Sequence, residues 1–315
     1  MGVTENVETV ETSTGRRPEG AVALRGMARW LWPLALANLV GNIAIVVTGG
    51  AVRLTSSGLG CPTWPQCTDG SYVPHGELGW HGAIEFGNRT LTFVLVAIAI
   101  SCWLAARSAL KAGVAGGRRS VRLATVIALG IPAQALLGGV TVLTDLNPWV
   151  VAGHLLLSMA IIAVCVLLLD HLRPAARAAA PAALWRLTLA TFAAGWLVLY
   201  LGTVVTGSGP HSGDLESRRT GLDPQVMSHV HAWAVYLLVA LSVAVLVLAL
   251  RRGLPVLVRA AVVLLGVEVL QGVIGFWQYF TDLPELLVGV HMLGAALTSA
   301  ALTWLLLAAR RRPRD

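Results

Sequence analysis

Residues 149–172 read WVVAGHLLLSMAIIAVCVLLLDHL, a run whose only formally charged member is Asp170. About 20 such residues cross the roughly 30 Å of hydrocarbon in a bilayer as an α-helix. The chain has eight stretches of this kind, and they are too long and too rich in Leu, Val and Ala for barrel strands. They predict transmembrane helices near residues 30–52, 84–106, 122–143, 149–172, 184–206, 228–250, 256–278 and 285–308.

The composition of the whole chain agrees with a membrane protein. Of its 315 residues, 56% are hydrophobic and 12% are charged, and the mean hydropathy is +0.73. Because a soluble domain carries about 25% charged residues, soluble and disordered proteins are excluded. The net charge of +7 comes from 23 Lys and Arg against 16 Asp and Glu. These charges lie between apolar runs, so we expect membrane lipid as a partner and no nucleic acid.

The positions of Lys and Arg predict the orientation. The N-terminal tail, the segments 107–122, 173–186 and 251–259, and the C-terminal tail hold 19 of the 23 basic residues. Such segments face the cytoplasm, which predicts a multi-pass protein of the cell membrane with both termini inside. Residues 1–29 are polar and acidic and lack an apolar core, so we expect a cytoplasmic tail and not a signal peptide.

Two cysteines, Cys61 and Cys67, fall in the first predicted outer loop. A disulfide bond can form and persist outside the cytoplasm, so we expect the two residues to be bridged. Metal binding by this pair is the alternative, and it is less favoured because no further Cys or clustered His completes a site.

The chain contains an internal repeat with an offset of 137 residues. Residues 134–154 and 271–291 coincide without a gap, with Gln, Gly, Thr-Asp-Leu and His all in register. Four helices per repeat give both halves the same orientation, which implies a pseudo-two-fold axis along the membrane normal. The predicted fold is an all-α polytopic membrane protein whose eight transmembrane helices form two pseudo-symmetric four-helix bundles, residues 30–172 and 184–308.

Polar residues inside the predicted helices gather at one depth, near the outer ends of four helices. Such residues are costly in lipid and are therefore candidates for function. His229 and His231 are two residues apart and point about 200° apart, so only one can face the bundle centre. Glu268 lies deeper and matches Ile131 in the repeat, and a structural role and a proton-path role both stay open. The layer itself comprises Glu85, Asn88, Arg89, His154, His229, His231 and His291.

Histidines on separate helices of an apolar bundle suit haem better than zinc. A porphyrin supplies the equatorial ligands of the iron and needs only one or two axial histidines. For any single histidine the alternative is a hydrogen-bonded interior side chain. The matched position and depth of His154 and His291 favour iron ligands for these two.

The residues together resemble the bacterial haem A synthases over about residues 30–308. The resemblance rests on GGAVRLTSSGLGCPTWPQC at 49–67, on IEFGNR at 84–89, on the two Gln-to-His blocks and on His231. It implies an oxidoreductase that converts haem O to haem A by oxidising the C8 methyl group of the porphyrin to a formyl group through hydroxylation.

The same resemblance implies roles for single residues. His231 and His291 would be the axial ligands of a haem b cofactor in the C-terminal half, 184–308. The N-terminal half, 30–172, would hold the substrate haem O, with His154 as its iron ligand and Glu85 as the catalytic residue. Glu85 would stabilise positive charge at the reacting carbon or relay a proton. A haem O synthase and an electron donor are further expected partners, and the family's outer-loop cysteine pair maps onto Cys61 and Cys67.

One position departs from the family pattern. Helix 2 of the family often carries Glu-x-x-His-Arg, whereas this chain has Asn88 at the histidine position. Either His154 alone holds the substrate iron, or His81 reaches in from one turn earlier.

Two other functions share some of these features. A di-haem membrane electron carrier linked to quinol would use the same histidines, but it does not call for Glu85 or for the cysteine loop. A transporter built on parallel repeats would need no absorbing cofactor.

Overall fold

The computed structural model describes residues 26–74, 79–173, 177–211, 213–214 and 217–310. In these residues the regular elements are helices, and an isolated β-bridge joins Thr68 and Ser71. The elements are the 3₁₀ helix η1 (Gly26–Trp30) and the α-helices α1 (Leu31–Leu54), α2 (Gly79–Lys111), α3 (Gly117–Leu143), α4 (Pro148–Leu172), α5 (Ala182–Ser208), α6 (Pro224–Arg251), α7 (Pro255–Phe280) and α8 (Glu285–Ala308).

Within the described part of the chain, eight helices are long and apolar enough to cross a membrane. Many large apolar side chains point outward from them, among them Phe93, Leu129, Trp233 and Phe280. An apolar surface of this kind suits contact with lipid. Helices are stable there because their backbone N–H and C=O groups hydrogen-bond to one another. The prediction of an all-α membrane protein with eight transmembrane helices is confirmed.

Several helices extend beyond the apolar stretches that predicted them. Helix α6 begins at Pro224 and not near 228, because the Asp223 side chain accepts hydrogen bonds from the backbone N–H groups of Gln225 and Val226. Such a cap, followed by proline in the first turn, begins a helix in polar sequence that hydropathy does not detect. At the start of the chain, the last residues of the expected tail form η1, and residues 1–25 lie outside the described residues.

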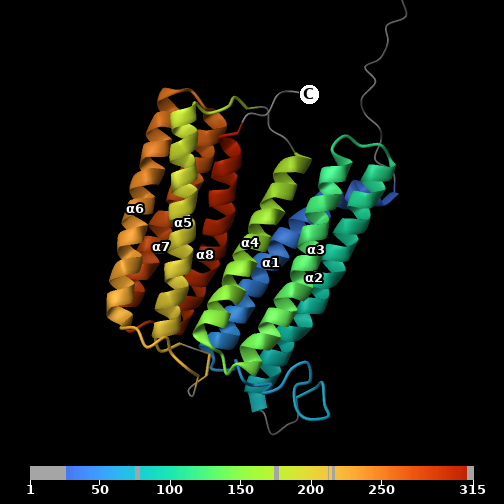
Figure 1. Ribbon diagram of the computed structural model, residues 1–315, viewed down its shortest axis with the longest axis vertical. Helices are drawn as coiled ribbons and strands as arrows, with labels where there is room; N and C mark the ends of the chain where they lie inside the picture. Colours follow the sequence, from blue (N-terminus) through green and yellow to red (C-terminus); the bar gives the residue numbers. More distant parts are fainter. Residues whose placement is uncertain (1–25, 75–78, 174–176, 212, 215–216, 311–315) are drawn as a thin grey trace, which may run out of the picture.

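Figure 1 shows α1–α4 on one side of the molecule and α5–α8 on the other. Each group has a core of buried Leu, Ile, Val and Ala, and the buried thiols Cys102 and Cys165 pack in the first. Between the groups, α8 contacts α1 and α4, and α4 contacts α5. The Ser299 hydroxyl on α8 donates a hydrogen bond to the Met159 carbonyl on α4 (2.8 Å), which ties the groups together at mid-height.

We call the end of the helices at which α1 ends and α2 begins the loop end, and the opposite one the arginine end. At the loop end, the Arg53 guanidinium joins the two groups. Its Nε atom donates to the His211 carbonyl (2.5 Å) and its Nη2 atom to the Thr206 carbonyl (3.1 Å). The Gly58 N–H also donates to the Gly213 carbonyl (2.9 Å). The long connections after α1 and after α5 therefore pack against each other.

Candidate functional site

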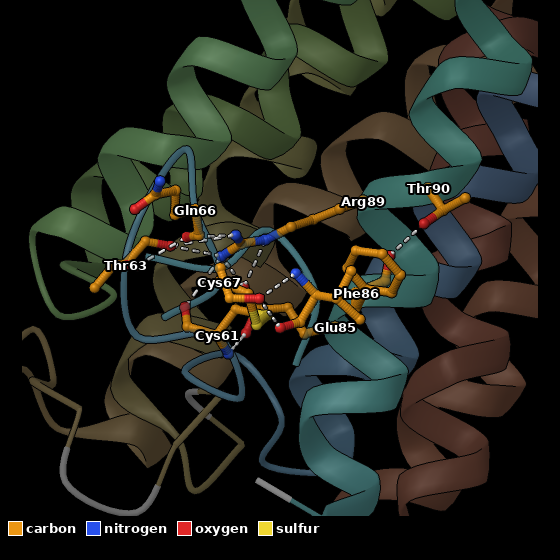
Figure 2. The surroundings of a disulfide bond; sticks show 10 residues. Cys61, Thr63, Gln66, Cys67, Glu85, Phe86, Arg89 and Thr90 are labelled. Carbon is orange, nitrogen blue, oxygen red and sulfur yellow. Dashed lines mark hydrogen bonds and ion pairs between the residues drawn. A yellow bond between two sulfur atoms is a disulfide. The ribbon is translucent and has the colours of Figure 1, made fainter. Parts of the chain in front are cut away.

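The connection between α1 and α2 is closed by a disulfide bond. Cys61 and Cys67 are bridged, with 2.00 Å between the sulfur atoms, and both residues are buried. The predicted disulfide is present in the structure. It makes residues 61–67 a small closed loop, which we call the disulfide loop, and this loop lies against the first turns of α2 (Figure 2).

Glu85 on α2 holds the disulfide loop directly. Its Oε2 atom accepts a hydrogen bond from the backbone N–H of Cys61 (2.6 Å). Its Oε1 atom accepts from Nε (3.1 Å) and Nη2 (2.6 Å) of Arg89, one helical turn further along. Glu85 is 5% exposed, so its ion pair with Arg89 lies largely out of solvent. A buried carboxylate is stable only with such partners, and here both oxygens have one.

Arg89 completes the attachment of the loop. Besides Glu85, its guanidinium donates to the carbonyls of Cys61 (3.0 Å), Thr63 (3.2 Å) and Gln66 (3.4 Å). The planar guanidinium has five N–H donors in a fixed arrangement, which suits this task. Figure 2 shows the side chain extending from α2 into the middle of the loop. Glu85 and Arg89 together fix the loop on α2.

The disulfide loop also contacts α3, next to His154 of the polar layer. The Trp64 ring packs so closely on Gly139 that a Cβ atom there would collide with it. The preceding residue, Gly138, faces His154, and a Cβ atom at Gly138 would lie 3.2 Å from Cε1 of that imidazole. Gly139 thus makes room for Trp64 of the disulfide loop, and Gly138 makes room for the His154 ring. This contact brings the loop beside the His154 site.

His154 on α4 and His291 on α8 have the same surroundings in the two repeats. Gln134 donates to the His154 carbonyl (3.1 Å), and Gln271 donates to the His291 carbonyl (3.0 Å). A Cβ atom at Gly275 would lie 3.6 Å from Cε1 of His291, which matches the role of Gly138.

The turns before these helices match as well. Asp145 and Leu146 have positive φ angles of 50° and 54°, and Asp282 and Leu283 have 56° and 58°. Residues other than glycine seldom adopt this left-handed conformation. The 137-residue sequence repeat is therefore also a repeat of local structure.

The C-terminal half brings a second histidine to this layer. His231 on α6 and His291 on α8 each lie about two turns from the start of their helix at the loop end. Gly202 on α5 leaves room for the first ring, since a Cβ atom there would be 3.3 Å from Cε1 of His231. Within the described residues, the buried Nδ1 atoms of both rings have no hydrogen-bond partner.

The N-terminal half has no such pair among its described residues. The Asn88 carbonyl oxygen accepts a hydrogen bond from the Thr48 hydroxyl on α1 (2.8 Å). His81 is a hydrogen-bond partner of the Ser57 hydroxyl through Nδ1 (3.0 Å), and its ring stacks on Trp80. His81 is therefore held against the connection after α1, while Asn88 bonds to its neighbouring helix. The Nδ1 atom of His154 is buried and without a partner, as in His291.

The remaining polar residues lie outside this arrangement. His229 is exposed and contacts the Tyr279 hydroxyl (3.4 Å), so of the two neighbours His231 is the one that turns inward. His211 and His171 bond to backbone carbonyls in connections between helices, and His75 lies outside the described residues. Glu268 on α7 is buried and accepts a hydrogen bond from Ser242 on α6 (2.7 Å).

The chemistry of these donors fits haem. Among the described residues there is no group of three or more His, Cys, Asp and Glu side chains that could hold a bare metal ion. A porphyrin needs fewer protein ligands, because it supplies the equatorial nitrogens. His231 and His291 offer two imidazoles on facing helices with buried, unpartnered nitrogens. His154 offers one.

Sequence reasoning missed three contributions to this site. The anchoring role of Arg89, the link made by Arg53 and the support of the histidine carbonyls by Gln134 and Gln271 all appear only in the structure. A signal existed for two of them. Glu85 and Arg89 are four residues apart, a spacing that pairs opposite charges on a helix, and the two glutamines match in the repeat.

Comparison with known proteins gives matches of one kind. Residues 29–85 match the family model COX15-CtaA, described as cytochrome oxidase assembly protein. The chain is 30% identical over 215 residues to a protein of Bradyrhizobium sp. named heme A synthase, covering 56% of each chain. It is 33% identical over 144 residues to a heme A synthase of Lysinibacillus sphaericus, covering 44% of each chain.

A third relative, from Paramagnetospirillum magneticum, carries the same name and is 30% identical over 169 residues, 51% of this chain and 44% of the relative. The chain thus spans about half the length of the curated relatives it matches. The matched family segment, 29–85, contains the disulfide loop and ends at Glu85.

Proposed function

The predicted resemblance to the bacterial haem A synthase family is confirmed by these matches, and from it we propose that this chain oxidises haem O to haem A. In this reaction the C8 methyl group of the porphyrin becomes a formyl group by way of a hydroxylated carbon. The observation that carries the proposal is the unequal pair of repeated histidine sites. One site offers two imidazoles, and the other offers one beside the anchored disulfide loop.

We propose that the C-terminal half holds a resident haem b. His231 and His291 would be the residues that hold it, on the support of their buried Nδ1 atoms and of the glycines that leave room for both rings. Bound haem b would supply one-electron transfer. Gln271 would act on the protein side, because its hydrogen bond to the His291 carbonyl fixes the backbone that carries the ligand.

We propose that the N-terminal half binds haem O as the substrate. His154 would hold the iron. Asn88 stands where the family often has a second histidine, so this position offers no imidazole, and its side chain bonds to Thr48 instead. The disulfide loop would form the rim of this site, since Trp64 lies on α3 next to the glycine that faces His154.

Glu85 would act at this rim. Its two oxygens bond to Cys61 and Arg89, which fixes the carboxylate in place and limits how far it can turn. This geometry supports an electrostatic role from a fixed position, stabilising positive charge that develops on the substrate. It also supports a positioning role through the loop. A charge-preserving variant separates the two, as described below.

The proposed location is the cell membrane with the loop end outside and both termini in the cytoplasm. Two features support it independently. Basic residues concentrate at the arginine end, in the connections after α2, α4 and α6. The disulfide bond lies at the opposite end, where an oxidising compartment would allow it to persist.

Pigment analysis tests the proposal. The chain would be produced in cells that also make haem O, purified in detergent, and its haems extracted and separated by chromatography with mass detection. We expect haem b together with a formyl porphyrin. A coloured protein that never yields a formyl or hydroxylated porphyrin would point to the di-haem electron carrier, and a colourless one to the transporter.

A further inference from the structure

A cavity of about 320 Å³ lies at the arginine end, between the two groups of helices. Its walls come from α4 on one side and from α7 and α8 on the other, and this volume far exceeds the roughly 10–15 Å³ that one water molecule requires. Figure 1 shows α4 and α8 diverging toward this end. The cavity is therefore a property of how the halves meet, and it is remote from the histidine layer at the loop end.

The charged lining of the cavity is unbalanced. Asp170 and Arg177 neutralise each other through two hydrogen bonds of 2.8 and 2.9 Å. Arg173 and Arg259 also line the cavity, and neither has a carboxylate within ion-pair distance among the described residues. Among the described residues, two guanidinium groups thus face one cavity without a counter-ion.

Arg173 is positioned by an aromatic ring and not by an ion pair with a carboxylate. Its guanidinium lies 3.6 Å from the centre of the Trp32 ring of α1. Stacking on an aromatic face leaves the N–H groups of the guanidinium pointing outward in its own plane, where they can bind a phosphate in bidentate fashion. The cation is therefore ordered before any anion binds.

Along α4 the cavity lining changes from charged to apolar with depth. Arg173 directly follows the last residue of α4, and Val166 lies seven residues earlier on that helix, roughly 10 Å deeper at 1.5 Å per residue. Leu169 and Trp304 extend this apolar lining, whereas on α7 Val256 lies nearer the arginine end than Arg259. A phosphate at the rim with hydrocarbon below it matches this order, whereas a free phosphate ion has no use for the apolar wall.

We propose that this cavity binds the phosphate group of an anionic phospholipid of the cytoplasmic leaflet. Arg173 and Arg259 contact the phosphate, and an acyl chain lies against Val166, Leu169 and Trp304, filling the space between the halves. Basic cavities between transmembrane helices on the cytoplasmic side are suited to such head groups. The inference rests on the proposed orientation and holds whether or not the chain oxidises haem.

Native mass spectrometry of the full-length protein in detergent tests this proposal. Dioleoyl phosphatidylglycerol should bind, dioleoyl phosphatidylcholine should bind much more weakly, and inorganic phosphate alone should neither bind nor compete at millimolar concentration. Replacing both arginines, Arg173→Gln with Arg259→Gln, should weaken phosphatidylglycerol binding roughly 30-fold, since each basic residue near such a lipid contributes about a factor of five.

Two controls keep the outcome interpretable. The pair Arg251→Gln and Arg252→Gln removes the same charge at the same end of the molecule, outside the cavity lining, and should leave binding within about twofold. Because Arg173 also packs on Trp32, the single variants Arg259→Gln and Arg259→Lys provide a second test that leaves that contact intact. The first should weaken binding, and the lysine should restore most of it.

Equal binding of the two lipids by the unaltered protein would overturn the proposal, as would equal losses in the cavity and control variants. Displacement of phosphatidylglycerol by inorganic phosphate would overturn the assignment to a lipid. A colourless preparation that still binds phosphatidylglycerol selectively would leave this site standing while the proposed haem chemistry fails.

Discussion

The two histidine sites of this molecule have matching surroundings, but they differ in the residue on the facing helix. In both halves a glutamine supports the histidine backbone, a glycine makes room for the ring, and a left-handed Asp-Leu pair precedes the helix. On the facing helix the C-terminal half has His231, whereas the N-terminal half has Asn88 bonded to Thr48. The disulfide loop packs on the N-terminal half. The repeated residues thus build the site, and the unrepeated ones distinguish the two halves.

This difference indicates how two repeated bundles could take separate roles, one retaining a porphyrin and the other binding a substrate. Two imidazoles on facing helices would retain a porphyrin, because both faces of the iron are taken. One imidazole would leave a face open, which suits a molecule that must arrive, react and leave. Glu85 and Arg89 of α2, which anchor the disulfide loop, supply additional charged groups on that side. The following predictions test this division, from the largest expected effect to the smallest.

Removing a histidine of the C-terminal pair should have the largest effect. His291→Ala or His231→Ala should lower bound haem b about tenfold or more, or convert its low-spin spectrum to high-spin, because one axial ligand is gone. His154→Ala should keep the resident haem b and lose haem A production. Pyridine haemochrome assays and optical spectra of purified protein measure both. If His154→Ala removes the resident haem and His291→Ala retains it, the roles of the two halves are reversed.

Removing the carboxylate of the loop anchor should separate chemistry from cofactor retention. Glu85→Ala should reduce haem A production on the order of 10²-fold or more while the haem b spectrum stays unchanged. Extracted haems should contain haem O or a partly oxidised product.

Glu85→Asp keeps the negative charge but shortens the reach to Cys61, so it distinguishes charge from position. Activity near that of the unaltered protein would indicate an electrostatic role, and a loss equal to that of Glu85→Ala would indicate positioning. Loss of haem b in Glu85→Ala would contradict the separation of the two sites.

Opening the disulfide should affect only the side that carries the loop. The double variant Cys61→Ser with Cys67→Ser should insert normally and keep haem b, because eight lipid-embedded helices do not depend on this bridge. Haem A production should fall several-fold, since the loop loses a constraint that is typically worth about 2–4 kcal/mol to a folded structure. In intact cells both cysteines of the unaltered protein should resist alkylation until a reductant is added. Free labelling without reductant would show that the bridge does not form.

The two glycines that face the histidines should differ in their tolerance of a methyl group. Gly138→Ala places Cβ 3.2 Å from the His154 ring, whereas Gly275→Ala places it 3.6 Å from His291, an ordinary contact distance. The first variant should cost about 1 kcal/mol through crowding and lower haem A yield a few-fold, and the second should retain haem b at its normal level. Haem yields from the two variants, expressed at matched levels, measure this. The opposite order would show that the histidine surroundings are not as similar as the geometry indicates.

The smallest effect is expected at the residue that breaks the symmetry. Asn88→Ala removes a hydrogen bond to Thr48 worth about 1 kcal/mol and no iron ligand. The haem b spectrum should therefore not change. Asn88→His supplies the second imidazole and should give a low-spin signal from haem O bound in the N-terminal half. A change in the resident haem spectrum of Asn88→Ala would mean that Asn88 contacts the cofactor.

The helices and the disulfide could be predicted from the sequence because each depends on local chemistry. Long apolar runs can only be helices in lipid, and Cys61 and Cys67 are six residues apart in one predicted outer loop. The His154–His291 repeat was visible because its polar residues are rare in apolar sequence. The helix starts at Gly79 and Pro224 were placed too late, since caps and polar first turns lie outside the apolar run.

The partners of the charged residues could not be predicted in the same way. Glu85 bonds to the backbone N–H of Cys61, and Arg89 to three loop carbonyls. All residue types except proline present the same backbone N–H and C=O groups. The sequence therefore does not show which backbone group a charged side chain will bond to. The cavity beside Arg173 was equally hidden, because it depends on the angle between two groups of helices. The roles of His154, His231 and His291 stay predictions.

The Arg53 link has a consequence for the order in which the protein is built. Its partner carbonyl at His211 lies 158 residues later in the chain. At a translation rate of about 5–20 residues per second, roughly 8–30 s separate the synthesis of the two. During that interval the guanidinium at the end of α1 must stay in the interfacial region, because a buried cation without acceptors is unstable in lipid. Although the halves are repeats of one unit, the first therefore cannot complete its own loop end, and a truncated N-terminal half would be a substrate for membrane quality control.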